Sequence, residues 1–250
     1  MREALANWRP ARVACIVSLL LIDRTDFFLP ASRGQVLAND LKENLDLPYN
    51  AGGSVEDSEE DPPEIVIFYG QSYEASAIVF ALDESGSMGD NGRWLIQSRE
   101  LGRAIAELGR ETQFGIVYYG SRVTTFRRYP VPATDENKKR GKAFVKSRRP
   151  EGDTCIGEGV VKALEIARKS EHKYRVVMVT SDGRPDVCGT GDRATSAQER
   201  QILANTKKAN PGGQVRVHTI YVGRDTERAA IDFLRRLATA HSGTSRTLSQ

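Results

Sequence analysis

The chain has 250 residues, of which 39% are hydrophobic and 28% are charged, which is ordinary for a globular protein of one or two domains. The formal net charge of +3 is too small to indicate nucleic-acid binding by itself. Three cysteines are too few for a disulfide framework, and neither a C-x-x-C pair nor Cys/His ligand spacing occurs, so the sequence argues against a zinc site.

The N-terminal quarter of the chain differs from the rest. The apolar stretch V-A-C-I-V-S-L-L-L-I at 13–22 follows basic residues and is too short to cross a bilayer as a helix. Its length and basic flank fit a signal or anchoring segment, which could tether the protein to a membrane or cell envelope. A buried strand and a helix packed on the domain are the alternatives. We expect an N-terminal segment at 1–48, an acidic linker rich in Pro and Gly at 49–64, and a compact domain at 65–250.

Within the compact domain, apolar runs of strand length alternate with amphipathic helical patterns. Strands are predicted at 76–82, 113–119, 123–129, 174–180, 215–222 and 246–248, and helices at 93–108, 135–147, 157–170, 195–210 and 226–241. The short Gly120-Ser121 turn makes the third strand an antiparallel hairpin partner of the second. The sequence therefore predicts an α/β fold: a doubly wound, mostly parallel sheet with one antiparallel edge strand and helices on both faces.

Polar side chains follow two of the buried strands. The run A-I-V-F-A-L ends in D-E-S-G-S, which places Asp83, Ser85 and Ser87 at the strand's carboxyl end, and the strand at 174–180 leads into T-S-D-G with Asp182. Ligands of open α/β sheets bind beyond the carboxyl ends of the strands, where the strand order reverses. If the first and fourth strands are neighbours at that point, the two acids meet across one crevice.

A third polar loop, E-G-D-T-C, precedes a predicted helix and offers Thr154 to the same crevice. Two carboxylates and three hydroxyls make an oxygen-only site that suits Mg²⁺ or Mn²⁺. Without a cation the two acids would repel each other, and one would tend to stay protonated. The alternative is that the acids cap neighbouring helices while the serines satisfy turn amides.

These motifs, D-E-S-G-S-M, G-D-T and T-S-D-G, resemble those of the von Willebrand factor type A domain with its metal-ion-dependent adhesion site. The resemblance covers 76–248, including S-G-T-S-R-T-L near the end, and F-Y-G-Q ahead of the first motif is similar to bacterial envelope-associated members. It implies a Rossmann-like fold and a metal coordinated partly through water, with an acidic side chain of a partner in the last coordination position. The metal ligands that it implies are Asp83, Ser85, Ser87, Thr154 and Asp182.

The resemblance implies a non-enzymatic module that binds a protein partner's Asp or Glu carboxylate through Mg²⁺ or Mn²⁺. The alternative is a subunit of a metal-insertion or remodelling complex, for which a separate chain would supply the ring ATPase because no G-x-x-x-x-G-K-[ST] loop occurs here. Catalysis is not expected, because neither serine of the motif has an evident histidine base. A cell-envelope, periplasmic or secreted location is favoured over the cytoplasm.

Other residues carry weaker signals. Cys155 and Cys188 should border the same crevice, so a disulfide between them is a hypothesis. The basic run at 122–149 is a solvated helix face or a flank that steers an acidic partner or touches anionic lipid; it lacks the stacking aromatics of a nucleic-acid site. Packing roles are expected for Met88, Trp94 and His241.

Overall fold

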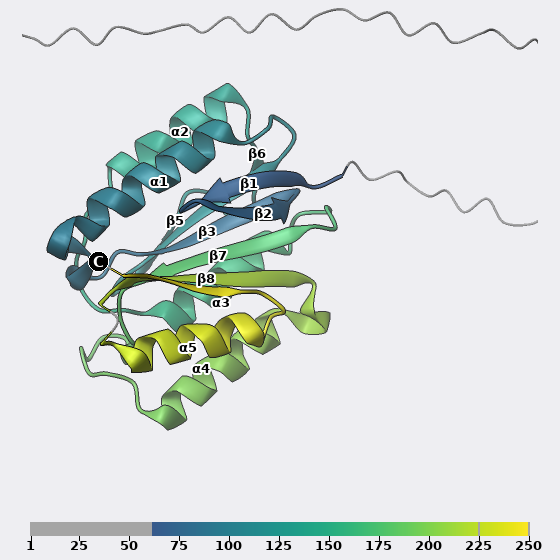
Figure 1. Cartoon of the computed structure of the whole chain (residues 1–250). Coiled ribbons are helices and arrows are strands. Elements are labelled where there is room, and N and C mark those ends of the chain that lie inside the picture. Colours follow the sequence, from purple (N-terminus) through teal and green to yellow (C-terminus); the bar gives the residue numbers. More distant parts are fainter. Residues whose placement is uncertain (1–61, 225, 250) are drawn as a thin grey trace, which may run out of the picture. The chain divides into compact units, whose positions relative to one another are not determined.

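The computed structural model describes residues 62–224 and 226–249 (Figure 1). The expected N-terminal segment and nearly all of the expected linker lie outside these residues, and so does the third cysteine, Cys15. The last expected linker residue, Glu64, is the first residue of a strand. No helix in the described part of the chain is both long enough and apolar enough to span a membrane.

A seven-stranded sheet lies at the centre of the described domain. Its strands are β3 (Ala77–Asp83), β4 (Gln113–Tyr119), β5 (Val123–Thr125), β6 (Val131–Pro132), β7 (Arg175–Ser181), β8 (Val215–Gly223) and β9 (Ser245–Ser249). The order is β5-β4-β3-β7-β8-β9, and β6 also pairs with β4. Only β5 and β6 run antiparallel to their neighbour. The predicted doubly wound α/β sheet is therefore confirmed.

The antiparallel edge strand differs from its prediction. A single strand was expected at 123–129, but β5 ends at Thr125 and the edge resumes as β6 at Val131. The N–H of Phe126 still donates to the carbonyl of Ile116 at 2.9 Å, after which the chain leaves the ladder. Pro130 has no N–H to offer at this edge, which favours a break between two short strands.

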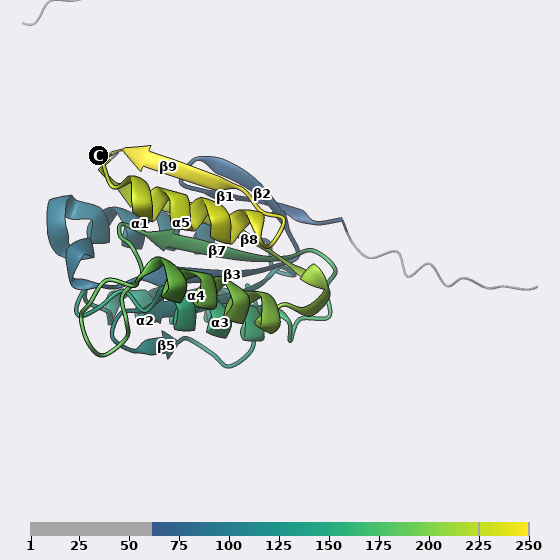
Figure 2. The same ribbon diagram turned by 90° about the horizontal axis from the view of Figure 1, so that it is seen from below.

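Helices cover both faces of the sheet, as predicted. Figure 1 shows α1 (Arg93–Glu107) and α2 (Asp135–Lys146) on one face. On the opposite face lie α3 (Ile156–Ala167), α4 (Ser196–Ala209) and α5 (Arg228–Thr239) (Figure 2). Two short 3-10 helices, η1 (Gly86–Gly92) and η2 (Pro211–Gly213), complete the list of helical elements in the described residues.

Strand β3 shows how the sheet is buried on both sides. Alternate residues of a strand point to opposite faces. Ile78, Phe80 and Leu82 belong to the core under α1 and α2, whereas Val79 and Ala81 belong to the core under α3 and α5. A strand with two apolar faces reads as a continuous apolar run, which is the pattern that predicted it.

A β-hairpin that the sequence analysis did not predict precedes the sheet. It consists of β1 (Glu64–Phe68) and β2 (Gln71–Ala75), joined at Tyr69 and Gly70, which have φ of 50° and 70°. Left-handed backbone at both turn positions is typical of tight hairpins. Inward-facing residues of the hairpin, such as Phe68, join the core under α1. The hairpin is further fixed by Arg246 of β9, which donates to the carbonyl of Tyr69 at 2.8 Å.

Candidate metal centre

The candidate site forms where β3 and β7 end side by side. These strands are parallel neighbours, with Leu82 opposite Thr180. Chain connections run outward from them in opposite directions, so this is the point where the strand order reverses. The predicted adjacency of the first and fourth strands is confirmed, and it brings Asp83 and Asp182 to the same edge of the sheet.

Four of the five predicted ligands form one hydrogen-bonded cluster. The carboxylate of Asp83 is fully buried; its Oδ1 accepts from the N–H of Ser85 at 2.8 Å, and its Oδ2 accepts from the hydroxyl of Ser181 at 2.6 Å. The hydroxyls of Ser85 and Ser87 lie 3.2 Å apart, and Ser87 donates to Oδ1 of Asp182 at 2.8 Å. The cluster is built from oxygen atoms of residues almost 100 positions apart in sequence.

The fifth predicted ligand, Thr154, is placed by its loop. The N–H of Gly86 donates to the carbonyl of Gly152 at 3.0 Å, which joins this loop to the first motif. The N–H of Thr154 donates to Oδ2 of Asp186 at 2.8 Å, which joins it to the loop after β7. Thr154 is 2% exposed. Backbone contacts rather than a side-chain bond to the other four residues therefore bring Thr154 to this edge.

The sequence analysis missed Arg93, which contacts this cluster. Asn91 and Gly92 have left-handed backbone, with φ of 51° and 74°, and turn the chain sharply into α1. Arg93, the first residue of that helix, forms an ion pair with Oδ2 of Asp182 and donates to the carbonyl of Ser87 at 3.0 Å. A basic residue that opens a helix without an acid in its first turn was the available signal.

Gln97 also supports the site from α1. Its side-chain amide donates to the carbonyl of Asp83 at 2.8 Å and accepts from the hydroxyl of Thr180 at 2.5 Å. Gln97 is fully buried, so both polar ends of its amide need these partners. It fixes the ends of β3 and β7 beneath the cluster.

The two carboxylates make the crevice short of positive charge. The pKa of Asp83 is raised to about 7, first by burial and then by the neighbouring charge of Asp182, while hydrogen bonds from Ser181 and Ser85 act in the opposite direction. This agrees with the expectation that the two acids repel each other. A cation at this position would relieve the repulsion.

The donor set fits a hard divalent cation such as Mg²⁺ or Mn²⁺, because all the gathered side-chain atoms are oxygens. No group of three or more His, Cys, Asp or Glu side chains among the described residues could hold a metal, so hydroxyls would have to complete the coordination. The guanidinium of Arg93 is the one feature at odds with the fit, because it already neutralises Asp182.

The alternative capping role is not what these side chains do. Neither η1 nor α1 has a side-chain cap, and Asp182 bonds to side chains rather than to a helix end. The alternative expected the serines to accept turn amides, but here it is Asp83 that accepts one, from the N–H of Ser85. Turn formation and a gathered oxygen cluster therefore coexist at Asp83.

A disulfide braces the candidate site. Cys155 and Cys188 are bonded, with their Cα atoms 5.4 Å apart, which confirms the hypothesis drawn from the sequence. The bond joins the loop of Thr154 to the loop that follows Asp182. The carboxylate of Asp153 adds a hydrogen bond from the N–H of Gly189 at 3.1 Å between the same loops.

The basic helix α2 leads toward the site. Arg148, just after α2, pairs with the carboxylate of Glu84 through bonds of 2.7 and 2.9 Å, so the acid beside Asp83 is already neutralised. Lys142, Lys146 and Arg149 form no ion pair with any acid in the described part of the chain. These three residues form an uncompensated cationic flank.

Three further residues pack as expected. Met88 is fully buried, and the ring of Trp94 lies 5.6 Å from that of Tyr118. His241 is buried, with its two ring nitrogens 3.0 Å from Asn210 Nδ2 and from Thr206 Oγ1. None of them contributes an atom to the oxygen cluster.

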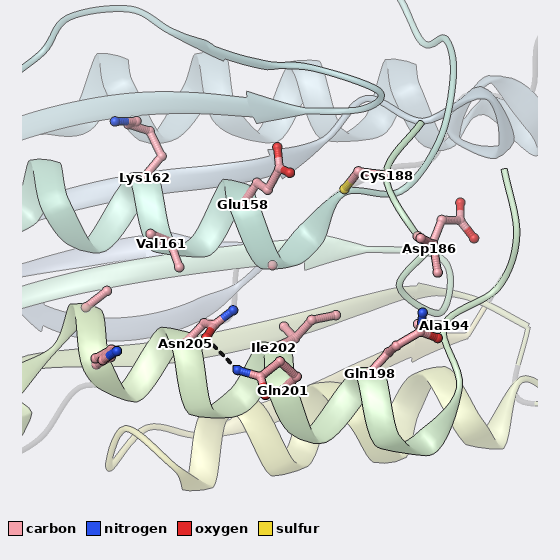
Figure 3. Close-up of a pocket in the computed structure, with 14 residues that line it drawn as sticks. Glu158, Val161, Lys162, Asp186, Cys188, Ala194, Gln198, Gln201, Ile202 and Asn205 are labelled. Carbon is pink, nitrogen blue, oxygen red and sulfur yellow. Dashed lines mark hydrogen bonds between the residues drawn. The ribbon is translucent and has the colours of Figure 1, made fainter. Parts of the chain in front are cut away.

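A separate groove of about 730 Å³ lies between α3 and α4 (Figure 3). Val161 and Ile202 contribute apolar surface, and the amides of Gln201 and Asn205, 2.9 Å apart, lie along the α4 side. Asp186 and Cys188 stand at one end of the groove. It is therefore next to the braced loops, but none of the five predicted ligands lines it.

The family model for the von Willebrand factor type A domain matches residues 77–247. The chain belongs to the von Willebrand factor type A domain family. Among curated relatives, it is 26% identical over 179 residues to inter-alpha-trypsin inhibitor heavy chain H3 of Pongo abelii, covering 68% of this chain and 19% of that protein. It is also 26% identical over 181 residues to human inter-alpha-trypsin inhibitor heavy chain H4, covering 69% of this chain and 18% of that protein. The chain thus spans about a fifth of the length of these relatives.

Solved structures share the type A fold. A von Willebrand factor type A protein from Catenulispora acidiphila superposes with a TM-score of 0.58 at 16% identity, covering 72% of this chain and 40% of that one. The pilus adhesin SpaC from Lactobacillus rhamnosus GG superposes with a TM-score of 0.55 at 15% identity, covering 70% of this chain and 29% of that one. The conserved hypothetical protein BatB from Bacteroides thetaiotaomicron superposes with a TM-score of 0.51 at 18% identity, covering 70% of this chain and 90% of that one. At these identities the likeness concerns the fold.

Proposed function

We propose that this type A domain is a non-enzymatic binding module that recognises an acidic group of a protein partner through a divalent cation. The observation that carries the proposal is the hydrogen-bonded oxygen cluster of Asp83, Ser85, Ser87 and Asp182 at the strand-order reversal. Those four residues and Thr154 would hold Mg²⁺ or Mn²⁺. The bound cation would supply positive charge and a coordination position for a partner's Asp or Glu oxygen.

The chain's own residues would prepare the site for that partner. Ser181 and Gln97 hold Asp83 from below, and Gln97 is fully buried, so the carboxylate is fixed before a ligand arrives. The disulfide holds the Thr154 loop against the loop after β7. A preorganised site loses less side-chain entropy when it binds.

The cationic flank of Lys142, Lys146 and Arg149 supports an acidic partner. These charges form no ion pair among the described residues, so they would attract an acidic surface over a distance of about 8–10 Å in physiological salt. One structural neighbour is a pilus adhesin, which agrees with a binding role.

Catalysis and the ATPase-linked role receive less support. The ring contacts of His218 and the hydrogen bonds of His241 lie away from Ser85 and Ser87, so neither histidine is placed as a base for a serine nucleophile. No observation favours a subunit that works with a separate ring ATPase. Disulfides are more common in exported proteins, which supports the proposed envelope or secreted location. A tether through residues 13–22 stays a proposal from the sequence.

Thermal unfolding of the full chain tests the metal site. The midpoint is measured in EDTA and in Mg²⁺, Mn²⁺ or Ca²⁺, because a cation that binds only the folded state stabilises it by about 2.7 kcal/mol at a hundredfold excess over its dissociation constant. We expect a rise of several degrees with Mg²⁺ or Mn²⁺.

The matched control is Asp83→Ala, in which this rise should vanish. An equal rise in the control would place the metal elsewhere, and no rise in the wild type at millimolar metal would contradict the proposed site.

A further inference from the structure

The positive charge of Arg93 lies at an electrostatically unfavourable position of its own helix. It is the first residue of α1, where the unpaired N–H groups of a helix carry partial positive charge and disfavour a cation. The first turn of α1 has no acidic residue, and its N-cap, Gly92, offers no side-chain cap. Arg93 therefore gains nothing from its helix, and its position needs another explanation.

The explanation lies in the crevice. The side chain of Arg93 is only 10% exposed, and the carboxylate of Asp182, its ion-pair partner, is fully buried. Its Nε is buried with no hydrogen-bond partner, so the guanidinium is only partly satisfied in this position. A buried charge is costly unless it is paired, and Asp182 provides the negative charge that keeps Arg93 here.

Arg93 occupies the same atoms that the proposed metal site needs. It contacts Oδ2 of Asp182 and the carbonyl of Ser87, while Oδ1 of Asp182 accepts from the Ser87 hydroxyl. A guanidinium and a divalent cation cannot hold the same carboxylate oxygen, because both the space and the like charges forbid it. Arg93 therefore competes with a metal for Asp182, and a metal that takes Oδ2 has to displace the guanidinium.

A place to which Arg93 can move exists beside it. A hollow of about 450 Å³ is lined by Arg93 itself and by Asn91, Ile96, Gly223 and Arg224. Because Arg93 itself lines the hollow, a change of its side-chain rotamer is the movement that an exchange would require. Among the described residues the lining includes two arginines and no acid, so a guanidinium turned into the hollow would offer its donors to an incoming anion.

We infer that Arg93 is a specificity-determining residue that exchanges Asp182 for the ligand's carboxylate. This inference rests on the proposed metal site. Without metal, Arg93 neutralises Asp182; when the site is filled, its guanidinium faces the hollow and binds the acidic group that approaches the site. Arg93 thereby weakens binding of a metal alone and favours joint binding of metal and a carboxylate ligand.

The decisive experiment measures the affinity for Mn²⁺ in the absence of a carboxylate ligand, by calorimetric titration of the full chain and of its Arg93→Gln variant. Removing the competing cation should tighten Mn²⁺ binding at least tenfold. In EDTA the same variant should unfold at a lower temperature than the wild type, because Asp182 has lost its counter-ion, whereas excess Mn²⁺ should raise its midpoint more than the wild type's. A merely structural role would lower stability without tightening metal binding.

Arg99→Gln is the matched control, because Arg99 is an exposed residue of the same helix that forms no ion pair with a described acid. It removes one positive charge near the site without freeing Asp182, and its Mn²⁺ affinity should stay within about twofold of the wild type. If Arg99→Gln gained as much Mn²⁺ affinity as Arg93→Gln, the effect would be explained by net charge alone, and the inference would be overturned.

A second measurement uses the unaltered chain and does not depend on a variant that folds. Phenylglyoxal modifies accessible arginines, and mass spectrometry can follow Arg93 alone. Its modification should be slow in EDTA and faster with Mn²⁺, and Asp83→Ala should abolish that difference. Unchanged reactivity of Arg93 at saturating Mn²⁺ would contradict the exchange.

The two proposals fail differently in these experiments. If neither the wild type nor Arg93→Gln binds Mn²⁺, the metal site itself is wrong. If the wild type binds Mn²⁺ and Arg93→Gln binds it equally or more weakly, the site stands and the role given to Arg93 is wrong.

Discussion

Two regions of this domain bury charged groups, and they balance those charges in opposite ways. At the candidate metal centre, two acids, Asp83 and Asp182, lie near one arginine: Arg93 forms an ion pair with Asp182, and Asp83 has only hydrogen bonds. Between α4 and α5, one acid, Glu199, is held by two arginines, Arg184 at 3.0 Å and Arg236 at 2.6 Å.

We propose that this difference separates a structural cluster from a site that binds an external ligand. Glu199 is 4% exposed and has both carboxylate oxygens in ion pairs, so its cluster is complete within the protein. The metal centre is short of positive charge and is instead held together by hydrogen bonds and a disulfide. A region that leaves its charges incompletely balanced is suited to an external ligand.

The largest expected effect concerns the covalent brace. Replacing both cysteines, in Cys155→Ser/Cys188→Ser, frees a loop with a sequence separation of 33 and should lower the free energy of unfolding by about 3–4 kcal/mol. Denaturant titration measures this loss. The Glu199 cluster has no disulfide. If the double variant unfolded at the same denaturant concentration as the wild type, the disulfide would not distinguish the stability of the two regions.

Breaking the structural cluster should cost less than breaking the disulfide. Glu199→Gln leaves Arg184 and Arg236 without their shared acid and should destabilise the fold by roughly 2 kcal/mol, because both arginines are about a third exposed and water partly screens their charges. The midpoint in EDTA should fall, and Mn²⁺ should still raise it by the wild-type increment. Loss of that increment would mean that the two regions are coupled.

The corresponding change at the metal centre should have a much smaller effect on stability. Asp83→Asn removes one of two neighbouring negative charges while keeping an oxygen to accept from the N–H of Ser85. The free energy of unfolding in EDTA should stay within about 1 kcal/mol of the wild type, because relief of repulsion offsets the weaker hydrogen bonds. The metal-dependent rise should disappear. A loss in EDTA as large as that of Glu199→Gln would erase the contrast between the regions.

The smallest effect should come from removing one of two redundant partners. Arg184→Gln leaves Glu199 paired with Arg236 and should cost only about 0.5 kcal/mol in denaturant unfolding. In EDTA this should be less than the cost of Arg93→Gln, after which Asp182 has no cation in contact. If Arg184→Gln and Arg93→Gln lowered the free energy of unfolding equally, the number of arginines paired with each acid would not distinguish the two regions.

The sequence by itself determined the architecture and most of the candidate ligands. Continuous apolar runs such as A-I-V-F-A-L can only be buried on both faces of a sheet, and their alternation with amphipathic helices leaves a doubly wound fold. Because that fold aligns strand ends, it also located Asp83 and Asp182 together. Strand boundaries at the edge, β5 and β6, were less predictable because their pairing is short.

Only the tertiary structure decided how the charges are distributed. The hairpin β1–β2 was missed although β1 is the apolar run E-I-V-I-F, because only the fold shows which of its alternating side chains pack under α1. Glu84 was adjacent to the motif in sequence, yet Arg148 neutralises it from 64 positions away. Arg93 reaches Asp182 across 89 positions because a left-handed turn at Gly92 aims it there. Sequence patterns record what a strand or helix buries, but the balance of charge around a site depends on contacts between elements far apart in the chain.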